Sequence, residues 1–146
     1  MGYIKFENVK IPIDLEKVLS ESEEREKLQS IKIERIYQST KVTKSKRAQN
    51  LKYIIVETEY TNGWREAVCP WRFNGVKIQG EQEYMDCCSR YDDNKMIQKV
   101  LGEYQLCGHK VEANSTAKVG WIFSMPDYVK KVEVISMTGE RIPYIL

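Results

Sequence analysis

The stretch VEANSTAKVGWIFSMPDYVKKVEVI, residues 111–135, decides the fold of this chain. Between residues 117 and 124 apolar side chains recur at every second position, which is the period of a strand with one buried face. The face expected to be buried carries Ala117, Val119, Trp121 and Phe123, and the opposite face carries Lys118, Gly120, Ile122 and Ser124. Trp121 and Phe123 are therefore predicted to be core residues.

The ends of this strand are marked by turn residues. Asn114, Ser115 and Thr116 precede it, and Pro126 ends it because proline cannot donate a hydrogen bond to a central ladder. A second strand follows, in which Val132 and Val134 face the core. Two successive strands with a short polar break predict an antiparallel meander or a sandwich edge rather than a βαβ unit.

Length and composition limit the class of protein. The chain has 146 residues, of which 42% are hydrophobic and 30% charged, values typical of one globular domain. The net charge of +2 gives no general attraction to nucleic acid or to anionic membranes. No run approaches the ~18 apolar residues that a membrane span requires. We therefore expect neither a nucleic-acid partner nor a membrane span.

The remaining segments predict further short strands and two helices. Residues 15–29 read as a surface helix laid over a sheet, and a short helix is expected to end at Leu101 with Gly102 beyond it. In the strand 31–37 the apolar residues change phase between Ile33 and Ile36, which indicates a bulge or a twist. The other expected strands lie at 3–13, 51–61, 75–80, 81–88, 104–111 and 141–146, and Asp14 and Asp92 or Asp93 are expected to cap the two helices.

Short strands separated by turns, without regular helical crossovers, indicate a β-sandwich. The predicted fold is mainly β: an immunoglobulin-like antiparallel β-sandwich with an N-terminal helix and a second short helix. We expect a single domain over residues 1–146, in which residues 1–30 form a strand and the helix and residues 31–146 form the sandwich.

Aromatic and arginine residues cluster in one segment and its surroundings. The candidate binding residues are Trp64, Arg65, Trp71, Arg72 and Tyr91, because binding surfaces are enriched in aromatic residues and arginine. The alternative is that these aromatic residues pack in the core at one end of the sandwich.

Two charged segments each have a functional interpretation and a structural one. Residues 21–27 form a solvated helix face or an acidic docking surface, and residues 39–50 form a solvated loop or a basic patch, in which no aromatic residue is available to stack bases.

Four cysteines leave two states open. Cys69, Cys87, Cys88 and Cys107 form a disulfide or thiol cluster, in which Cys87 or Cys88 can bridge to Cys107 or Cys69 in an oxidising environment or all four stay free. His109 lies two residues after Cys107, so a strand would place both on one face as a Cys–His pair, although such neighbours rarely reach nucleophile–base geometry. No CxxC spacing occurs, so we expect no metal, and no motif predicts a cofactor.

Two segments carry a resemblance to a known family. The segment LKYIIVETEYTN, residues 51–62, resembles a strand of the telokin-like, immunoglobulin-like domains of Gram-positive bacterial envelope proteins and lipoproteins. Residues 111–134 are similar to a later segment of these domains, in which a polar turn leads to a strand with Gly120, Phe123 and Pro126 at the matching positions. The resemblance covers about residues 31–136 and implies a sandwich without a general catalytic set.

These observations predict a non-enzymatic β-sandwich binding or accessory domain whose partner is another protein. The alternatives are a cytoplasmic host-interaction or mobile-element inhibitor protein, and a small ligand-binding domain or Cys/His-dependent enzyme. The N-terminus lacks the uncharged apolar core of a signal peptide, so a complete chain is expected to be cytoplasmic. If Met1-Gly2 is a cloning remnant on a trimmed protein, an extracellular or envelope location is expected, since the resembling family usually carries a secretion or lipoprotein signal.

Overall fold

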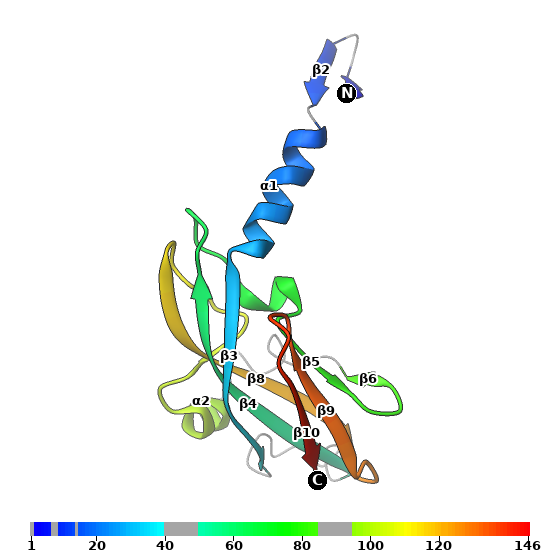
Figure 1. The fold of residues 1–146 in the computed structure, drawn as a ribbon, viewed down its shortest axis with the longest axis vertical. Coiled ribbons are helices and arrows are strands. Elements are labelled where there is room, and N and C mark those ends of the chain that lie inside the picture. Colours follow the sequence, from blue (N-terminus) through cyan, green and yellow to red (C-terminus); the bar gives the residue numbers. More distant parts are fainter. Residues whose placement is uncertain (1, 7–8, 14, 40–49, 85–94) are drawn as a thin grey trace.

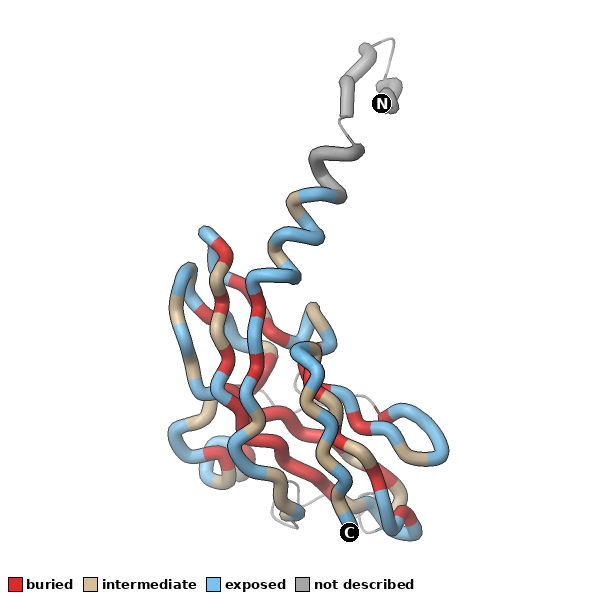
Figure 2. The backbone as a smooth tube through the Cα atoms, viewed as in Figure 1, coloured by how far each residue is buried: buried red, intermediate tan, exposed pale blue. Residues whose placement is uncertain are grey.

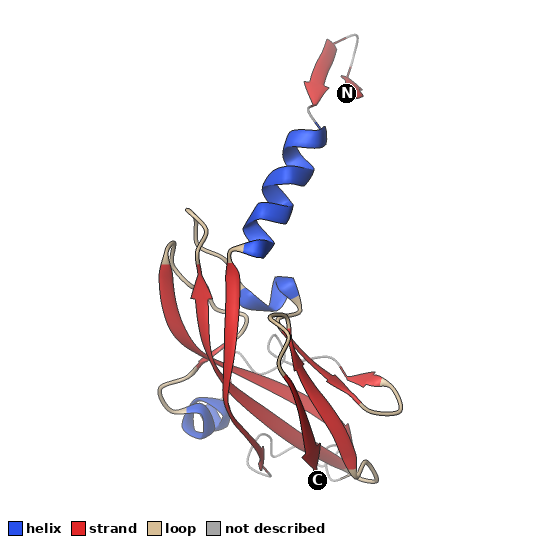
Figure 3. Cartoon of the chain, viewed as in Figure 1, coloured by secondary structure: helices blue, strands red, loops and turns tan. Residues whose placement is uncertain are grey.

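The computed structural model describes residues 2–6, 9–13, 15–39, 50–84 and 95–146. Within these ranges the chain forms ten β-strands, two α-helices and a 3-10 turn (Figures 1 and 3). The elements are β1 (Gly2–Phe6), β2 (Val9–Ile13), α1 (Leu15–Lys27), β3 (Gln29–Ser39), β4 (Leu51–Asn62), η2 (Pro70–Phe73), β5 (Val76–Gln79), β6 (Glu83–Tyr84), α2 (Lys95–Leu101), β7 (Gln105–Leu106), β8 (Ser115–Pro126), β9 (Lys131–Ser136) and β10 (Arg141–Ile145). The predicted mainly-β fold with an N-terminal and a second short helix is confirmed.

Two four-stranded sheets form the sandwich, with strand orders β3-β4-β8-β7 and β10-β9-β5-β6. All pairs within them are antiparallel except β7 with β8, which is parallel. β1 and β2 form a separate antiparallel pair. The prediction of a meander or sandwich edge for β8 and β9 is wrong, because both strands lie inside their sheets and belong to different ones. The turn that closes with Val129 N donating to Pro126 O at 3.1 Å carries the chain from one sheet to the other.

The inner faces of the two sheets share one hydrophobic core (Figure 2). Trp121 and Phe123 are fully buried, as predicted, and Val132 and Val134 contribute from the facing sheet. Gly75 lies directly against the Trp121 ring, since a Cβ at position 75 would sit 3.0 Å from Trp121 Cη2. The side chains that alternate inward along β8 therefore pack against the second sheet, as the period of two requires.

The outer face of β8 is also buried, which the alternation did not predict. Gly120 and Ile122 are both buried on this face. The helix α2 covers it at Gly120, where an added Cβ would lie only 2.7 Å from Leu101 Cδ2. On β3, which β4 separates from β8, the Tyr37 hydroxyl donates to the carbonyl of Val100 at 3.4 Å. A second layer thus covers part of the sheet and makes the central strands apolar on both faces.

The edge strand β3 is tied to the second sheet by side chains. The register of β3 on β4 shifts between Ile33 and Arg35, which confirms the predicted bulge. The Thr138 hydroxyl donates to Ile31 O at 2.8 Å, and Glu140 Oε1 accepts from Ile33 N at 3.0 Å. Because these contacts use backbone groups at the free edge of β3, they cover part of an edge that would otherwise be open to pairing.

The helix α1 extends away from the sandwich instead of lying over a sheet (Figure 1). Its end at Lys27 is close to the predicted one. From residue 20 to residue 28 no residue is buried, and Leu28 is 42% exposed. The prediction of a sheet-covering helix is wrong because residues 20–27 of the helix, SESEEREK, carry no apolar side chain to bury.

Several local predictions have definite outcomes. Gly102 has φ +58 directly after α2, as expected for a residue that terminates a helix. The expected strand 104–111 is reduced to β7, because His109 N bonds to Leu106 O in a turn and Val111 pairs with Val68. The proposed helix caps Asp14, Asp92 and Asp93, the loop 40–49 and residues 85–88 lie outside the described residues.

Candidate functional site

The structure separates the predicted aromatic and arginine residues into a core part and a surface part. Trp64 is 2% exposed, and two guanidinium groups lie over its ring, that of Arg25 at 5.6 Å from the centroid and that of Arg65 at 4.2 Å. Its backbone N donates to Asn62 Oδ1 at 2.9 Å. Trp64 is therefore a core residue, as the alternative interpretation expected, and Arg65 covers it from outside.

Trp71 and Arg72 form the surface part. They lie on η2, which is followed by Asn74 in a left-handed conformation, with φ 47. Trp71 is 46% exposed, and the Arg72 guanidinium lies 5.9 Å from its ring centroid. Trp71 N donates to the carbonyl of Cys107 at 3.0 Å, which fixes the position of this turn. Tyr91, the fifth candidate, lies outside the described residues.

Next to η2 lies a surface groove of about 320 Å³, which we call the basic groove. Its lining consists of Arg25, Glu66, Ala67, Val68, Cys69, Arg72, Phe73 and Lys110. Three of these residues are basic and one is acidic, so the groove carries a net charge of +2. None of the three basic side chains forms an ion pair with a carboxylate in the described part of the chain.

Three distant segments build the basic groove. Arg25 comes from the last turn of α1, Arg72 from η2 and Lys110 from the segment before β8. Backbone hydrogen bonds hold the last two segments together: Val68 N donates to Val111 O at 3.0 Å, and Val111 N donates to Val68 O at 2.7 Å. The walls of the groove are thus positioned by the backbone.

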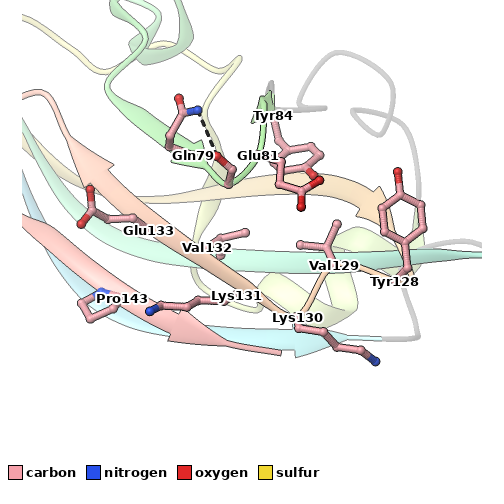
Figure 4. A pocket seen from close by; sticks show the side chains of 11 residues that line it. Gln79, Glu81, Tyr84, Tyr128, Val129, Lys130, Lys131, Val132, Glu133 and Pro143 are labelled. Atoms are coloured by element: carbon pink, nitrogen blue, oxygen red, sulfur yellow. Dashed lines mark hydrogen bonds between the residues drawn. The ribbon is translucent and has the colours of Figure 1, made fainter.

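A second and larger groove, of about 640 Å³, lies along β9 beside the turn between β5 and β6 (Figure 4). We call it the tyrosine groove. Its lining consists of Gln79, Gly80, Glu81, Tyr84, Tyr128, Val129, Lys130, Lys131, Val132, Glu133 and Pro143. Tyr84 is 8% exposed and Tyr128 is 69% exposed. Burial first, then the proximity of Tyr128 and of the Glu81 carboxylate, raises the pKa of the Tyr84 phenol.

The cysteines differ in state. Cys69 is a free, half-buried cysteine in the basic groove, whereas Cys107 is fully buried and disulfide-bonded. Cys87 and Cys88 lie outside the described residues. Because a disulfide sulfur is not a thiolate, Cys107 has no nucleophile to pair with His109, and the Cys–His hypothesis fails at this pair.

Sequence reasoning missed three kinds of groove residue. Arg25 was counted with a solvated helix face, and Lys110 belonged to no candidate set. Neither Tyr84 nor Tyr128 belonged to a candidate set, although they line one groove. No local signal joins these residues, because the segments that carry them meet only in the folded chain. Tyr84 and Tyr128, for example, are brought close by the pairing of β5 with β6 and with β9.

Comparisons with known proteins concern the fold. No family model and no curated protein matches the chain. A solved structure described as a "putative lipoprotein" from Bacillus subtilis is 12% identical with a TM-score of 0.48; the match covers 82% of this chain and 36% of that one, so this chain spans about a third of its length. An uncharacterized β-sandwich protein from Clostridium difficile is 15% identical with a TM-score of 0.48, covering 81% of this chain and 85% of that one. In the described residues, no helix is long and apolar enough to cross a membrane.

Proposed function

We propose that this chain is a non-enzymatic binding domain that docks an acidic segment of another protein in the basic groove, with Trp71 as the adjoining contact. The observation that carries this proposal is the absence of carboxylate partners for Arg25, Arg72 and Lys110 within the described residues. Some exposed cations elsewhere in the described part of the chain are paired, Lys118 with Glu103 at 2.8 Å and Arg141 with Glu133 at 2.9 Å, whereas the three cations of the basic groove are not.

The composition of the surface supports a protein partner of this charge. Tryptophan and arginine are the residues that contribute most often to binding energy at protein interfaces. A 46% exposed Trp71 beside Arg72 supplies apolar area and a guanidinium that can bind a carboxylate in bidentate fashion. Val68 and Phe73 add apolar surface to the groove. An acidic segment with an apolar residue matches both features.

Since the whole chain has a net charge of only +2, a general attraction for anions does not explain such binding. The proposed interaction is local, and its strength is expected to fall with salt because the groove is open to solvent. The host-interaction alternative would use the same surface and differ only in the origin of the partner.

A peptide array of random sequences probed with the full chain tests this function. The bound peptides are expected to be rich in Asp and Glu, and the double variant Arg72→Glu/Lys110→Glu should bind the best of them at least about tenfold more weakly, or about 1.4 kcal/mol. The matched control is Lys77→Glu, an exposed lysine on β5 outside the groove, which should change affinity by less than about twofold. Bound peptides without an acidic excess, or an equal loss in the control, would contradict the proposal.

A further inference from the structure

The tyrosine groove shares no lining residue with the basic groove and calls for a ligand of different chemistry. Its side chains include two lysines and two glutamates, so its net charge is zero. Figure 4 shows the Tyr84 and Tyr128 rings on either side of Val129, with the Glu81 carboxylate near Tyr84. The groove thus combines aromatic surface, an apolar floor and both signs of charge.

We propose that the tyrosine groove binds a neutral saccharide, with the exposed ring of Tyr128 as a stacking surface and Glu81 as a hydrogen-bond acceptor for hydroxyl groups. The C–H face of a sugar ring is apolar and packs on an aromatic ring. Its hydroxyl groups both donate and accept hydrogen bonds, so they match a wall that offers carboxylate acceptors and ammonium donors together.

The polar groups of the groove are available for such contacts. Glu81, Lys130 and Lys131 form no ion pair in the described part of the chain, while Glu133 is engaged by Arg141 at 2.9 Å. The zero net charge favours neither a polyanion nor a polycation. A proline-rich peptide, the other ligand of aromatic grooves, offers backbone carbonyl acceptors and no N–H at its prolines, so it would use the donors of this wall and leave the carboxylates unmatched.

The groove is held open and in place by its backbone. Lys52 Nζ donates to Val129 O at 3.2 Å, and Leu146 N donates to Lys130 O at 2.9 Å, so the wall that carries Tyr128 is anchored at two points. At Gly80 an added Cβ would contact Tyr84 Cε2 at 3.4 Å and Val132 Cγ1 at 3.5 Å. A larger side chain there would therefore grow into the groove, and the absence of one leaves room for a ligand.

Titration of the full chain with neutral hexasaccharides of β-linked glucose, xylose and mannose, followed by amide chemical shifts in NMR, tests the proposal. At least one is expected to give saturable shifts at Gly80, Val129 and Val132. Tyr128→Ala should weaken this binding about tenfold, and Gly80→Leu should abolish it by filling the groove. The control Leu28→Ala removes an apolar side chain that is 42% exposed and lines neither groove, and it should leave the affinity unchanged.

The same titration distinguishes the competing outcomes. No saturable shift with any of the three saccharides overturns the proposal, as does binding of a proline-rich peptide in the groove without saccharide binding. Saccharide binding that persists in Tyr128→Ala places the site elsewhere and also overturns it. Since Tyr128 is 69% exposed, its removal should not unfold the chain, so this variant remains decisive if Gly80→Leu fails to fold. The basic groove is not tested by these outcomes, because its variants and ligands are different.

Discussion

Asn62 is the centre of a buried polar network at the end of β4. Its Nδ2 donates to the backbone carbonyls of Glu66, Val111 and Glu112 at 2.9, 3.1 and 3.1 Å. Its Oδ1 accepts from Gln29 Nε2 at 2.8 Å and from the backbone N of Trp64. From the sequence, Asn62-Gly63 indicates only a turn. The contacts to residues far along the chain could not be predicted, because they depend on which segments pack beside the turn.

Tyr60 belongs to the same network, and its phenol makes the stability of the fold vary with pH in the alkaline range. Its hydroxyl donates to Gln29 Oε1 at 2.6 Å, and burial raises the pKa of Tyr60 well above the ordinary 10.0. Because the pKa of Tyr60 is higher in the folded state than in the unfolded state, its contribution to the free energy of unfolding is complete below about pH 10. Above that pH the unfolded state releases the phenol proton while the folded state keeps it, so the contribution is lost as the pH rises toward the folded pKa.

We expect the free energy of unfolding, measured by urea titration, to fall between about pH 10 and 12, and to fall less steeply in Tyr60→Phe. At neutral pH this variant should be about 1–2 kcal/mol less stable, because Gln29 Oε1 loses its buried donor. The control Thr61→Val also removes a hydroxyl group from β4, but one that does not titrate in this pH range, and it should keep the slope of the native chain. Equal slopes in Tyr60→Phe and the native chain would contradict this assignment.

At the scale of elements, β8 shows which burial the alternation of side chains predicts and which it does not. Its alternation correctly predicted the inner face, which carries Trp121 and Phe123. It did not predict the burial of Gly120 and Ile122, because cover by α2 comes from a helix elsewhere in the chain. Alternation reports the two faces of one strand and says nothing about what lies above each of them.

Close packing of α2 on β8 predicts a specific sensitivity at Gly120. Gly120→Ala should lower the free energy of unfolding by about 1–3 kcal/mol, because its Cβ would lie 2.7 Å from Leu101 Cδ2. The double variant Gly120→Ala/Leu101→Ala should lose less free energy of unfolding than the sum of the losses in the two single variants, because Leu101→Ala relieves the contact with the new Cβ. The matched control Gly80→Ala makes only ordinary contacts, at 3.4 Å or more, and should be nearly neutral in thermal unfolding. Additive costs would show that α2 moves away without strain.

At the scale of the whole molecule, the sandwich and the N-terminal segment differ in how much they contribute to the buried core. The core is formed by strands β3 to β9 and α2, and no residue from 20 to 28 is buried in it. Figure 1 shows α1 and the β1–β2 pair extending from one end of the sandwich. A two-stranded sheet alone is marginally stable in water, so the stability of the fold is expected to reside in the sandwich.

Deletion of residues 1–19 tests this division. The truncated chain should unfold cooperatively, with a midpoint in differential scanning calorimetry within about 4 °C of the full chain, equivalent to less than about 1 kcal/mol. It retains the Arg25 contact with Trp64 and the bond from Gln29 Nε2 to Arg25 O at 3.1 Å. A loss of cooperative unfolding would show that the N-terminal segment is part of the folding unit.

The sequence by itself determined the features that follow from short-range geometry. Side-chain period, turn residues and the phase change after Ile33 are set within a few covalent bonds, and they correctly predicted a mainly-β chain, its bulge and its core residues. Only the tertiary structure decided which sheet each strand joins, the exposure of Trp71 against the burial of Trp64, and the two grooves. These depend on which strands pair and which apolar faces bury one another, and those choices bring Arg25 to Lys110 and Tyr84 to Tyr128 from segments with no local connection.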